Sequence, residues 1–354
     1  MALAAAPLYD RMDSCRALPG SAPAVAFAGG PEGAREGSDG SMRGGGAWGA
    51  SRCGSHSGRS VANVNISASA TVTACAKTSQ SFLNMNGQET VDPDTPLDAG
   101  AADAATVPVE ALAACLEEIL APSGFDDYCP NGLQVEGDRP VRLLVSGVTA
   151  SAEFIRRATA MGADALLVHH GWFWKGEDPR LRGPRRERVR LVLQAGMHLF
   201  AYHLPLDAHE TLGNNVQLAL RLGWRVDRRE GRYGLLNLHD LPQPVNARAI
   251  GASVASALGR EPLLVGELDR AVQTVAWCTG AAQDMIEAAI DAGAQLYLSG
   301  EVSERTTHAA REAGIAYVAA GHHATERYGV QALGDEVARR LGCVHRFVDD
   351  DNPV

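Results

Sequence analysis

The chain lacks the features that would assign it to several large protein classes. No apolar run reaches the roughly 18 to 20 residues that a membrane span needs, so we expect no membrane-spanning segment. Lys and Arg number 32 against 42 Asp and Glu, for a net charge of −10, which argues against a broad nucleic-acid-binding surface. The GxxxxGK[ST] phosphate loop, a GxGxxG after a strand and the GxSxG elbow are also missing, which argues against the common nucleotide-hydrolase and serine-hydrolase families.

Cysteines are few and scattered. The seven are an odd number and never form a CxxC pair, which argues against a disulfide scaffold and against a structural zinc site. This usage is typical of a reducing compartment, so we expect a cytoplasmic protein. The cysteines are Cys15, Cys53, Cys75, Cys115, Cys129, Cys278 and Cys343.

Residues 1–106 differ in composition from the rest of the chain. They are rich in Ala, Gly, Ser and Asp and have little helical or strand periodicity, so they cannot bury enough surface to offset their ordering entropy. We predict a disordered low-complexity tail. Two other interpretations stay open: a transit peptide, which would place the protein in an organelle, and a natural start at Met85, which would exclude residues 1–84.

Residues 107–354 show a regular alternation of strands and helices, and the alternation repeats. Module one spans about 107–223, with strands at 141–148, 165–168 and 198–202; module two spans about 271–354, with strands at 274–279, 295–298 and 316–319. A joining segment, about residues 224–270, connects the two modules. The pattern predicts an α/β fold of two duplicated modules with mostly parallel sheets.

Polar residues that can bind metal follow the predicted strands. His169, His170, His203 and His322 all stand at carboxyl ends, where open α/β sheets place their ligand sites. Each module also carries an acid four residues after a histidine, Asp207 after His203 and Glu326 after His322. We expect Asp207 on a loop, because Pro205 favours an extended Leu204, and His322 to Glu326 in one helical turn.

These six ligands suit two metal ions bound between the modules. About three protein ligands per ion would leave positions for water, as in catalytic sites. Nitrogen and oxygen donors fit divalent Zn, Fe, Mn, Co or Ni without selecting among them. Nearby, His209, His323 and Glu301 are candidates for supporting or proton-carrying roles, although Glu301 could instead be an acid at a helix start. Trp172, Phe173 and Trp174 could stack on a nucleobase, but core or interface packing is the commoner use of such clusters.

Five motifs carry a family resemblance: HHGWFWKGE, YHLPLDAHETLGNN, SGEVSE, AAGHHATE and PNGLQVEG. Over roughly residues 107–354 the chain resembles the YbgI-like dinuclear-metal-centre proteins, known as GTP cyclohydrolase 1 type 2 homologues. The resemblance implies that His169, His170, His203, Asp207, His322 and Glu326 bind two metal ions. It also implies a toroidal homohexamer whose sites face an inner cavity.

The sequence leaves two functions open. The first is a metal-dependent hydrolase in which a metal-bound water attacks a small-molecule substrate, possibly a purine nucleotide, while His323 or Glu301 carries protons. The second is a non-catalytic assembly that holds or delivers metal, or that regulates a partner. The metal ligands alone do not separate them.

Overall fold

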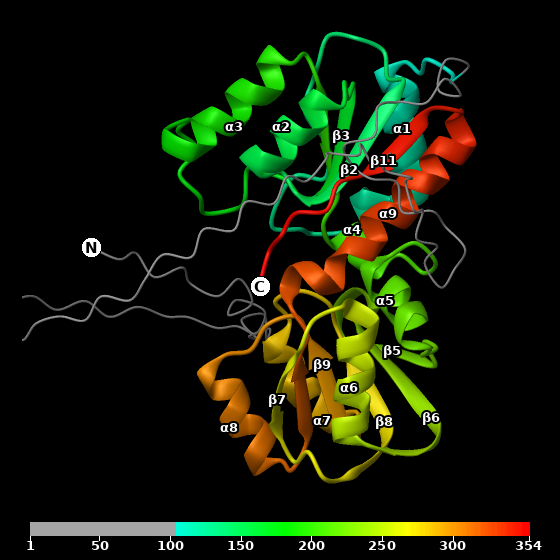
Figure 1. The fold of residues 1–354 in the computed structure, drawn as a ribbon, viewed down its shortest axis with the longest axis vertical. Helices are drawn as coiled ribbons and strands as arrows, with labels where there is room; N and C mark the ends of the chain where they lie inside the picture. Colours follow the sequence, from blue (N-terminus) through cyan, green and yellow to red (C-terminus); the bar gives the residue numbers. More distant parts are fainter. Residues whose placement is uncertain (1–103) are drawn as a thin grey trace, which may run out of the picture. The chain divides into compact units, whose positions relative to one another are not determined.

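The computed structural model describes residues 104–354, and the predicted tail otherwise lies outside them. The described chain is a mixed α/β protein with two sheets (Figure 1). None of its helices combines the length and the apolarity required to cross a membrane. The α-helices are α1 (Val109–Leu120), α2 (Ala152–Ala160), α3 (Gly183–Gln194), α4 (Leu204–Ala208), α5 (Asn214–Leu222), α6 (Ala247–Leu258), α7 (Ile286–Asp291), α8 (Glu304–Glu312) and α9 (His322–Leu341). The strands are β1 (Gly132–Val135), β2 (Leu143–Thr149), β3 (Ala165–His170), β4 (His198–Ala201), β5 (Arg228–Glu230), β6 (Leu236–Asn246), β7 (Leu263–Gly266), β8 (Ala271–Trp277), β9 (Leu296–Ser299), β10 (Ala316–Ala319) and β11 (Val344–Phe347).

The first sheet has the strand order β1-β4-β3-β2-β11. All its neighbours pair in parallel except β1 and β4. Successive side chains of β2 alternate between its faces: Leu144 packs with α1 and α9, whereas Leu143 and Val145 pack with the cluster that includes α2 and α3. Because both faces are covered, the central strands β2, β3 and β4 are largely apolar, as is usual in parallel sheets.

The second sheet has the order β5-β6-β8-β9-β10-β7. Its centre, β8-β9-β10, is parallel, while β5, β6 and β7 pair antiparallel. Residues 224–270, which we expected only to join the modules, form β5, β6, α6 and β7 and complete this sheet. These strands cover the edges that the parallel strands would otherwise expose. Because they pair antiparallel, the second sheet is mixed. The prediction of an α/β fold with two sheets is confirmed.

Helix α9 connects the two sheets. It begins directly after β10 of the second sheet and packs against β2, β3 and β11 of the first. Strand β11 then returns the chain to the first sheet beside β2, a return that the sequence pattern did not predict. The first turn of α9 therefore lies where strand ends from both modules meet.

Gly329 permits a close approach between α9 and α5. A Cβ at this position would lie 2.2 Å from Asn214 Oδ1 and 2.9 Å from the Asn214 backbone nitrogen. Gly329 N–H donates to Asn214 Oδ1 (3.1 Å), and the Asn214 amide donates to Asp207 Oδ1 (2.8 Å). The contact therefore couples helix packing to a predicted metal ligand.

We predict that Gly329→Ala destabilises the protein by about 1–3 kcal/mol through overpacking. Chemical denaturation of the metal-free protein measures the effect. In an unobstructed helix interior the same substitution stabilises by about 0.5–1 kcal/mol, so an increase in the free energy of unfolding would show that the two helices do not meet as described.

Candidate metal centre

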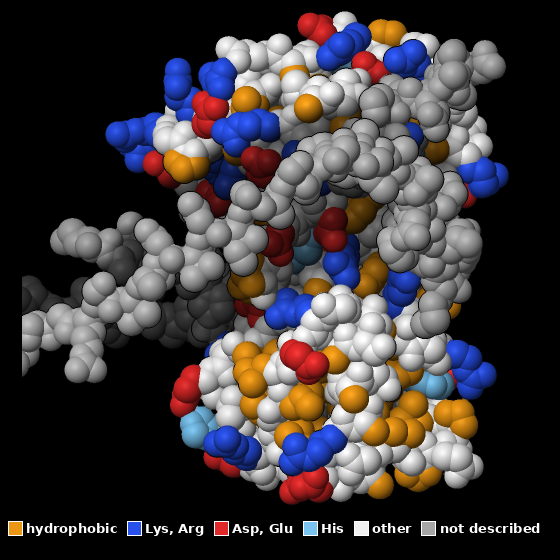
Figure 2. All heavy atoms as spheres, in the orientation of Figure 1, with side chains coloured by type: hydrophobic (Ala, Val, Ile, Leu, Met, Phe, Trp, Pro, Cys, Tyr) orange, Lys and Arg blue, Asp and Glu red, His pale blue; other side chains and the backbone are white. Residues whose placement is uncertain are grey.

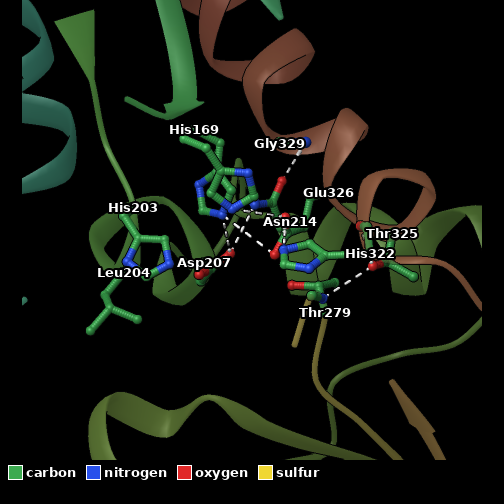
Figure 3. Close-up of polar contacts among 12 residues, drawn as sticks. His169, His203, Leu204, Asp207, Asn214, Thr279, His322, Thr325, Glu326 and Gly329 are labelled. Atoms are coloured by element: carbon green, nitrogen blue, oxygen red, sulfur yellow. Dashed lines mark hydrogen bonds and ion pairs between the residues drawn. The ribbon is translucent and has the colours of Figure 1, made fainter. Parts of the chain in front are cut away.

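The structure brings all six predicted ligands into one cluster at the carboxyl ends of β3, β4 and β10. Figure 3 labels five of them, His169, His203, Asp207, His322 and Glu326. Within it, three overlapping groups have ligand atoms that all lie within 4.8 Å of one another. Residues from both modules take part, so the cluster lies between them. The groups are His169 with His170 and His203, His170 with His322 and Glu326, and His169 with Asp207 and Glu326.

His169 and His170 are the last two residues of β3. We predicted that the strand ends at Val168, but its ladder continues until His170 pairs with Thr149 of β2. The two rings nevertheless converge, with centroids 4.4 Å apart. The strand ends at this point, which frees the two side chains from the strict alternation of a longer ladder.

Asp207 reaches the cluster on a helix, and the prediction of a loop was wrong. After His203 the chain forms the single turn α4, closed by bonds from the Leu206 and Asp207 N–H groups to the His203 carbonyl. Pro205 is tolerated because it lies in the first turn of the helix, where backbone N–H groups have no partner within the helix, so the lack of an N–H costs nothing. The tight turn places Asp207 back beside the histidines.

His322 and Glu326 form the first turn of α9, as predicted. Their i, i+4 spacing puts both side chains on one face of the helix, and His322 Nε2 lies 3.1 Å from Glu326 Oε2. The Thr325 hydroxyl fixes the turn, because it donates to the His322 carbonyl and accepts from Gly280 N–H. Glu326 is thereby buried on the inner side of the centre.

All four imidazoles form their outer hydrogen bond through the same ring nitrogen. Each Nδ1 has a hydrogen-bond partner on the outside of the cluster, which leaves Nε2 to face inward. Histidine ligands of metals use this arrangement, since the bond at one nitrogen sets the tautomer and the direction of the lone pair on the other. The contacts are His169 Nδ1–H to the Tyr202 carbonyl (3.0 Å), His203 Nδ1–H to Asp127 Oδ1 (2.7 Å), His322 Nδ1–H to Glu301 Oε1 (2.6 Å), and His170 Nδ1 with the Thr149 hydroxyl (3.1 Å).

The Nε2 atoms of His169, His170 and His322 lie close to two buried carboxylates. His169 Nε2 lies 3.5 Å from both Asp207 Oδ1 and Glu326 Oε1, and His170 Nε2 lies 3.2 Å from Glu326 Oε2. Yet His169 Nε2 and Glu326 Oε2 are buried without any hydrogen-bond partner. Such atoms are costly unless something else binds them. A divalent cation coordinated by nitrogen and oxygen would satisfy both, so the donor set fits the expected metal.

Electrostatics favour a proton on two of the imidazoles of the centre, whereas burial holds the pKa of a third, His170, well below its usual value. Burial opposes protonation of His169 and His322, but the neighbouring carboxylates raise the pKa of His169 to about 9 and that of His322 to about 10. Burial opposes ionisation of Glu326, but the surrounding imidazoles hold its pKa well below the usual value. In the metal-free centre, protons on His169 and His322 therefore balance the charge of the carboxylates, and metal binding must displace these protons.

Two residues of the centre were missed by the sequence analysis. Asp127 is almost fully buried, and its carboxylate accepts from His203 Nδ1–H and from Leu204 N–H (2.9 Å). Asn131 Oδ1 accepts from His203 N–H (2.7 Å). The only sequence signal was their place in and next to the PNGLQVEG motif. Cys129 lies beside Asp127 and His203, but burial raises the pKa of its thiol to about 12, so it stays a neutral thiol in the metal-free protein.

The three residues considered for supporting roles have different positions. Glu301 accepts from His322, which lowers the pKa of its carboxyl; it precedes α8 and is not part of its first turn. The ring of His323 instead contacts Asp349 (2.8 Å), and it is not in the cluster. His209 Nδ1 accepts from the Leu212 N–H after α4. Of the three, only Glu301 touches a predicted ligand.

The three consecutive aromatic residues, 172 to 174, lie in three different environments. Trp172 is buried in the core of the first module, and its indole N–H donates to the Ala150 carbonyl. Phe173 is exposed and has a φ of 66°, a backbone conformation that side chains rarely adopt. Trp174 lies against the centre, its ring 5.0 Å from that of His203 and nearly perpendicular to it. Core packing therefore explains Trp172 alone.

Gly280 offers a test of the centre. It has a φ of +68°, and an added Cβ would lie 2.0 Å from Glu326 Oε1 and 3.2 Å from His322 Nε2. We predict that Gly280→Ala weakens metal binding at least tenfold, because the methyl group must displace the carboxylate. Elemental analysis after gel filtration and metal titration measure the effect.

Gly259→Ala is the matched control. Gly259 has a φ of +69° but open space around its Cβ position, so both substitutions carry a similar backbone cost of about 1–2 kcal/mol. Equal metal affinities in the two variants would refute the placement of Glu326 beside Gly280.

Comparison with known proteins agrees with the fold and with the family resemblance. The chain matches the model of the Duf34/NIF3 (NGG1p interacting factor 3) family over residues 107–353. It is 53% identical over 240 residues to the GTP cyclohydrolase 1 type 2 homolog of Allochromatium vinosum, covering 67% of this chain and 94% of the relative. The corresponding protein of Pseudomonas aeruginosa is 49% identical over 250 residues, covering 69% and 99%.

Solved structures give the same result. Protein ybgI, described as being of unknown function, matches with a TM-score of 0.67 and 44% identity over 69% of this chain and 98% of its own. The protein TTHA1606 from Thermus thermophilus matches with a TM-score of 0.64 and 34% identity over 69% and 99%. The family resemblance is thereby confirmed, and the chain belongs to the Duf34/NIF3 family.

Proposed function

We propose that the protein is a dinuclear metal-dependent hydrolase. The observation that carries the proposal is the common use of the four imidazoles: every Nδ1 has a partner outside the cluster, and the Nε2 atoms of three of the rings lie within 3.5 Å of the buried carboxylates of Asp207 and Glu326. Six ligands would hold two divalent ions, Zn, Fe, Mn, Co or Ni, with positions left open. The name of the relatives, GTP cyclohydrolase 1 type 2 homolog, favours a purine nucleotide as the substrate.

When bound, the two ions would supply an acidified water as the nucleophile at neutral pH. The residues of the chain hold and orient the centre. Asp127 and Glu301 fix the tautomers of His203 and His322. Glu301 is proposed as the proton carrier at the rim because it is the candidate that contacts a ligand directly, although its bond to His322 lowers its pKa and so makes it a weaker base. His323, bonded to Asp349, is not proposed as a proton carrier.

Substrate would approach from the side of His170 and His322. The side chain of His169 is fully buried, whereas 16% of His170 and 24% of His322 is exposed. Figure 2 shows that acidic and basic side chains are mixed on this face of the described chain. Trp174 stands beside this side of the centre, 6.0 Å from the His170 ring, where its face could contact a planar substrate.

We further propose a cytoplasmic homohexamer. Leu133, Phe173 and Leu181 are exposed apolar side chains on β1 and on the segment that follows β3, and burial between subunits would remove them from water. The four cysteines of the described chain are all free, which agrees with a reducing compartment. Sedimentation velocity should give a species of six subunits, and a stable monomer at micromolar concentration would contradict the assembly.

Loss of a ligand tests the enzymatic proposal. We predict that metal-loaded protein opens or hydrolyses a substrate in a single-turnover panel that includes GTP and other phosphorylated and cyclic compounds. His170→Ala and Asp207→Asn should lower the rate by at least a hundredfold, because each removes one of about three ligands from an ion. His308→Ala, on an exposed face of α8, should leave the rate unchanged.

The alternative function has its own signature. In that case the metal-replete protein would turn over none of the panel but would pass its metal to an acceptor chelator faster than free exchange allows. This result would show that the protein holds or delivers metal and is not a hydrolase. Turnover that persists in both ligand variants would show that the chemistry occurs elsewhere.

A further inference from the structure

The first turn of α9 carries a second pair of polar side chains beside the predicted ligands. His322 and Glu326 belong to the centre. The residue after each of them, His323 and Arg327, repeats the same i, i+4 spacing, so the second pair lies on the neighbouring face of the same turn. Both of its members contact one carboxylate: His323 Nε2 lies 2.8 Å from Asp349 Oδ1, and Arg327 Nη1 donates to Asp349 Oδ2 (3.0 Å).

The backbone of Asp349 belongs to the first module. The preceding residue, Val348, extends β11, because its N–H donates to the Ser146 carbonyl of β2 (2.9 Å) and its side chain is buried. The Asp349 carbonyl accepts a hydrogen bond from Arg157 of α2. Asp349 is therefore fixed to the first sheet and to α2, while its side chain holds the helix that begins at the second sheet.

The last residues of the chain reinforce the same contact. The Ser151 hydroxyl, at the start of α2, donates to Asp350 Oδ2 (2.8 Å). Val354 N–H donates to Asn352 Oδ1 (3.0 Å), and the Val354 carbonyl accepts from His323 N–H (2.9 Å). That N–H is one of those that the first turn of a helix leaves without a partner within the helix. Figure 1 draws the end of the chain beside this turn.

The contacts of Asp349 serve the placement of the turn more than the stability of the fold. Its side chain is 47% exposed, and ion pairs at such exposure contribute little to folding. A metal site, in contrast, tolerates deviations of only about 0.2 Å in its ligand distances. Because His322 and Glu326 belong to one turn, a small shift of that turn would displace both ligands together.

We propose that Asp349 is a positioning residue of the metal centre. It holds the first turn of α9 against the first module, so that His322 and Glu326 meet the ligands that β3 and α4 supply. The inference rests on the metal centre of the proposed function and adds a determinant of metal affinity that is not itself a ligand.

Asp335→Ala is the matched control for Asp349→Ala. Asp335 lies on α9, its Oδ1 is 2.8 Å from His345 Nδ1 on β11, and its side chain is 60% exposed. Each substitution thus removes an exposed carboxylate from a contact with histidine between α9 and the segment of β11, but Asp335 lies about two helical turns beyond Glu326. We expect both metal-free variants to melt within about 4 °C of the wild type, as loss of a weak ion pair predicts for a domain of this size.

Cobalt(II) titration, followed by visible absorption, measures affinity and coordination geometry together. We expect Asp349→Ala to bind one of its two ions roughly 10-fold more weakly, the low end for residues that support metal ligands, and to show an altered cobalt spectrum. Asp349→Asn should be intermediate, because its one amide oxygen can accept from only one of His323 and Arg327. Asp335→Ala should keep the wild-type spectrum and stay within about twofold in affinity, because distant sites act independently.

Equal cobalt affinities and spectra in Asp349→Ala and Asp335→Ala would overturn the inference. So would a large fall in the melting temperature of Asp349→Ala with unchanged cobalt binding, because it would assign the carboxylate to the fold alone. Failure of the hydrolase proposal is a separate result. It would appear as absent turnover in a wild type whose cobalt binding still depends on Asp349.

Discussion

The centre depends on one buried carboxylate. Glu326 is 3% exposed, and one of its oxygens has no hydrogen-bond partner although His170 and His322 face it. A buried charge of this kind persists only when it is compensated. The surrounding structure supplies that compensation: α9 fixes the carboxylate in its first turn, and Gly280, by its lack of a side chain, leaves the carboxylate room.

The duplicated fold explains why the ligands converge. In each sheet the parallel strands place their carboxyl ends at one edge, so β3 and β4 deliver His169, His170 and His203, while β10 delivers α9 with its first-turn ligands. Successive strands of the second sheet also approach closely at that edge, where Gly300 N–H donates to the Gly280 carbonyl. Neither module alone contains all six predicted ligands. Helix α9 belongs to the second module and packs against the first, and so brings the two sets of ligands together.

Much of this arrangement could be predicted from the sequence because it follows local rules. Apolar strands that end in histidines, and the i, i+4 spacing of His322 and Glu326, are periodicities of single elements. Asp127 could not be found in this way, since its contact with His203 joins residues 76 positions apart. The turn around Pro205 was mispredicted because closure of α4 onto His203 overrode the local preference for an extended chain. The role of residues 224–270 was missed because antiparallel edge strands have weak patterns.

The most direct test of the central claim is X-ray absorption spectroscopy of the metal-loaded protein. We predict nitrogen and oxygen ligands only, with the multiple scattering of imidazole and a second metal at about 3.5–4 Å. A sulfur scatterer would instead assign the metal to Cys129, which lies beside Asp127 and His203. An isolated ion with no metal neighbour would contradict the dinuclear centre itself.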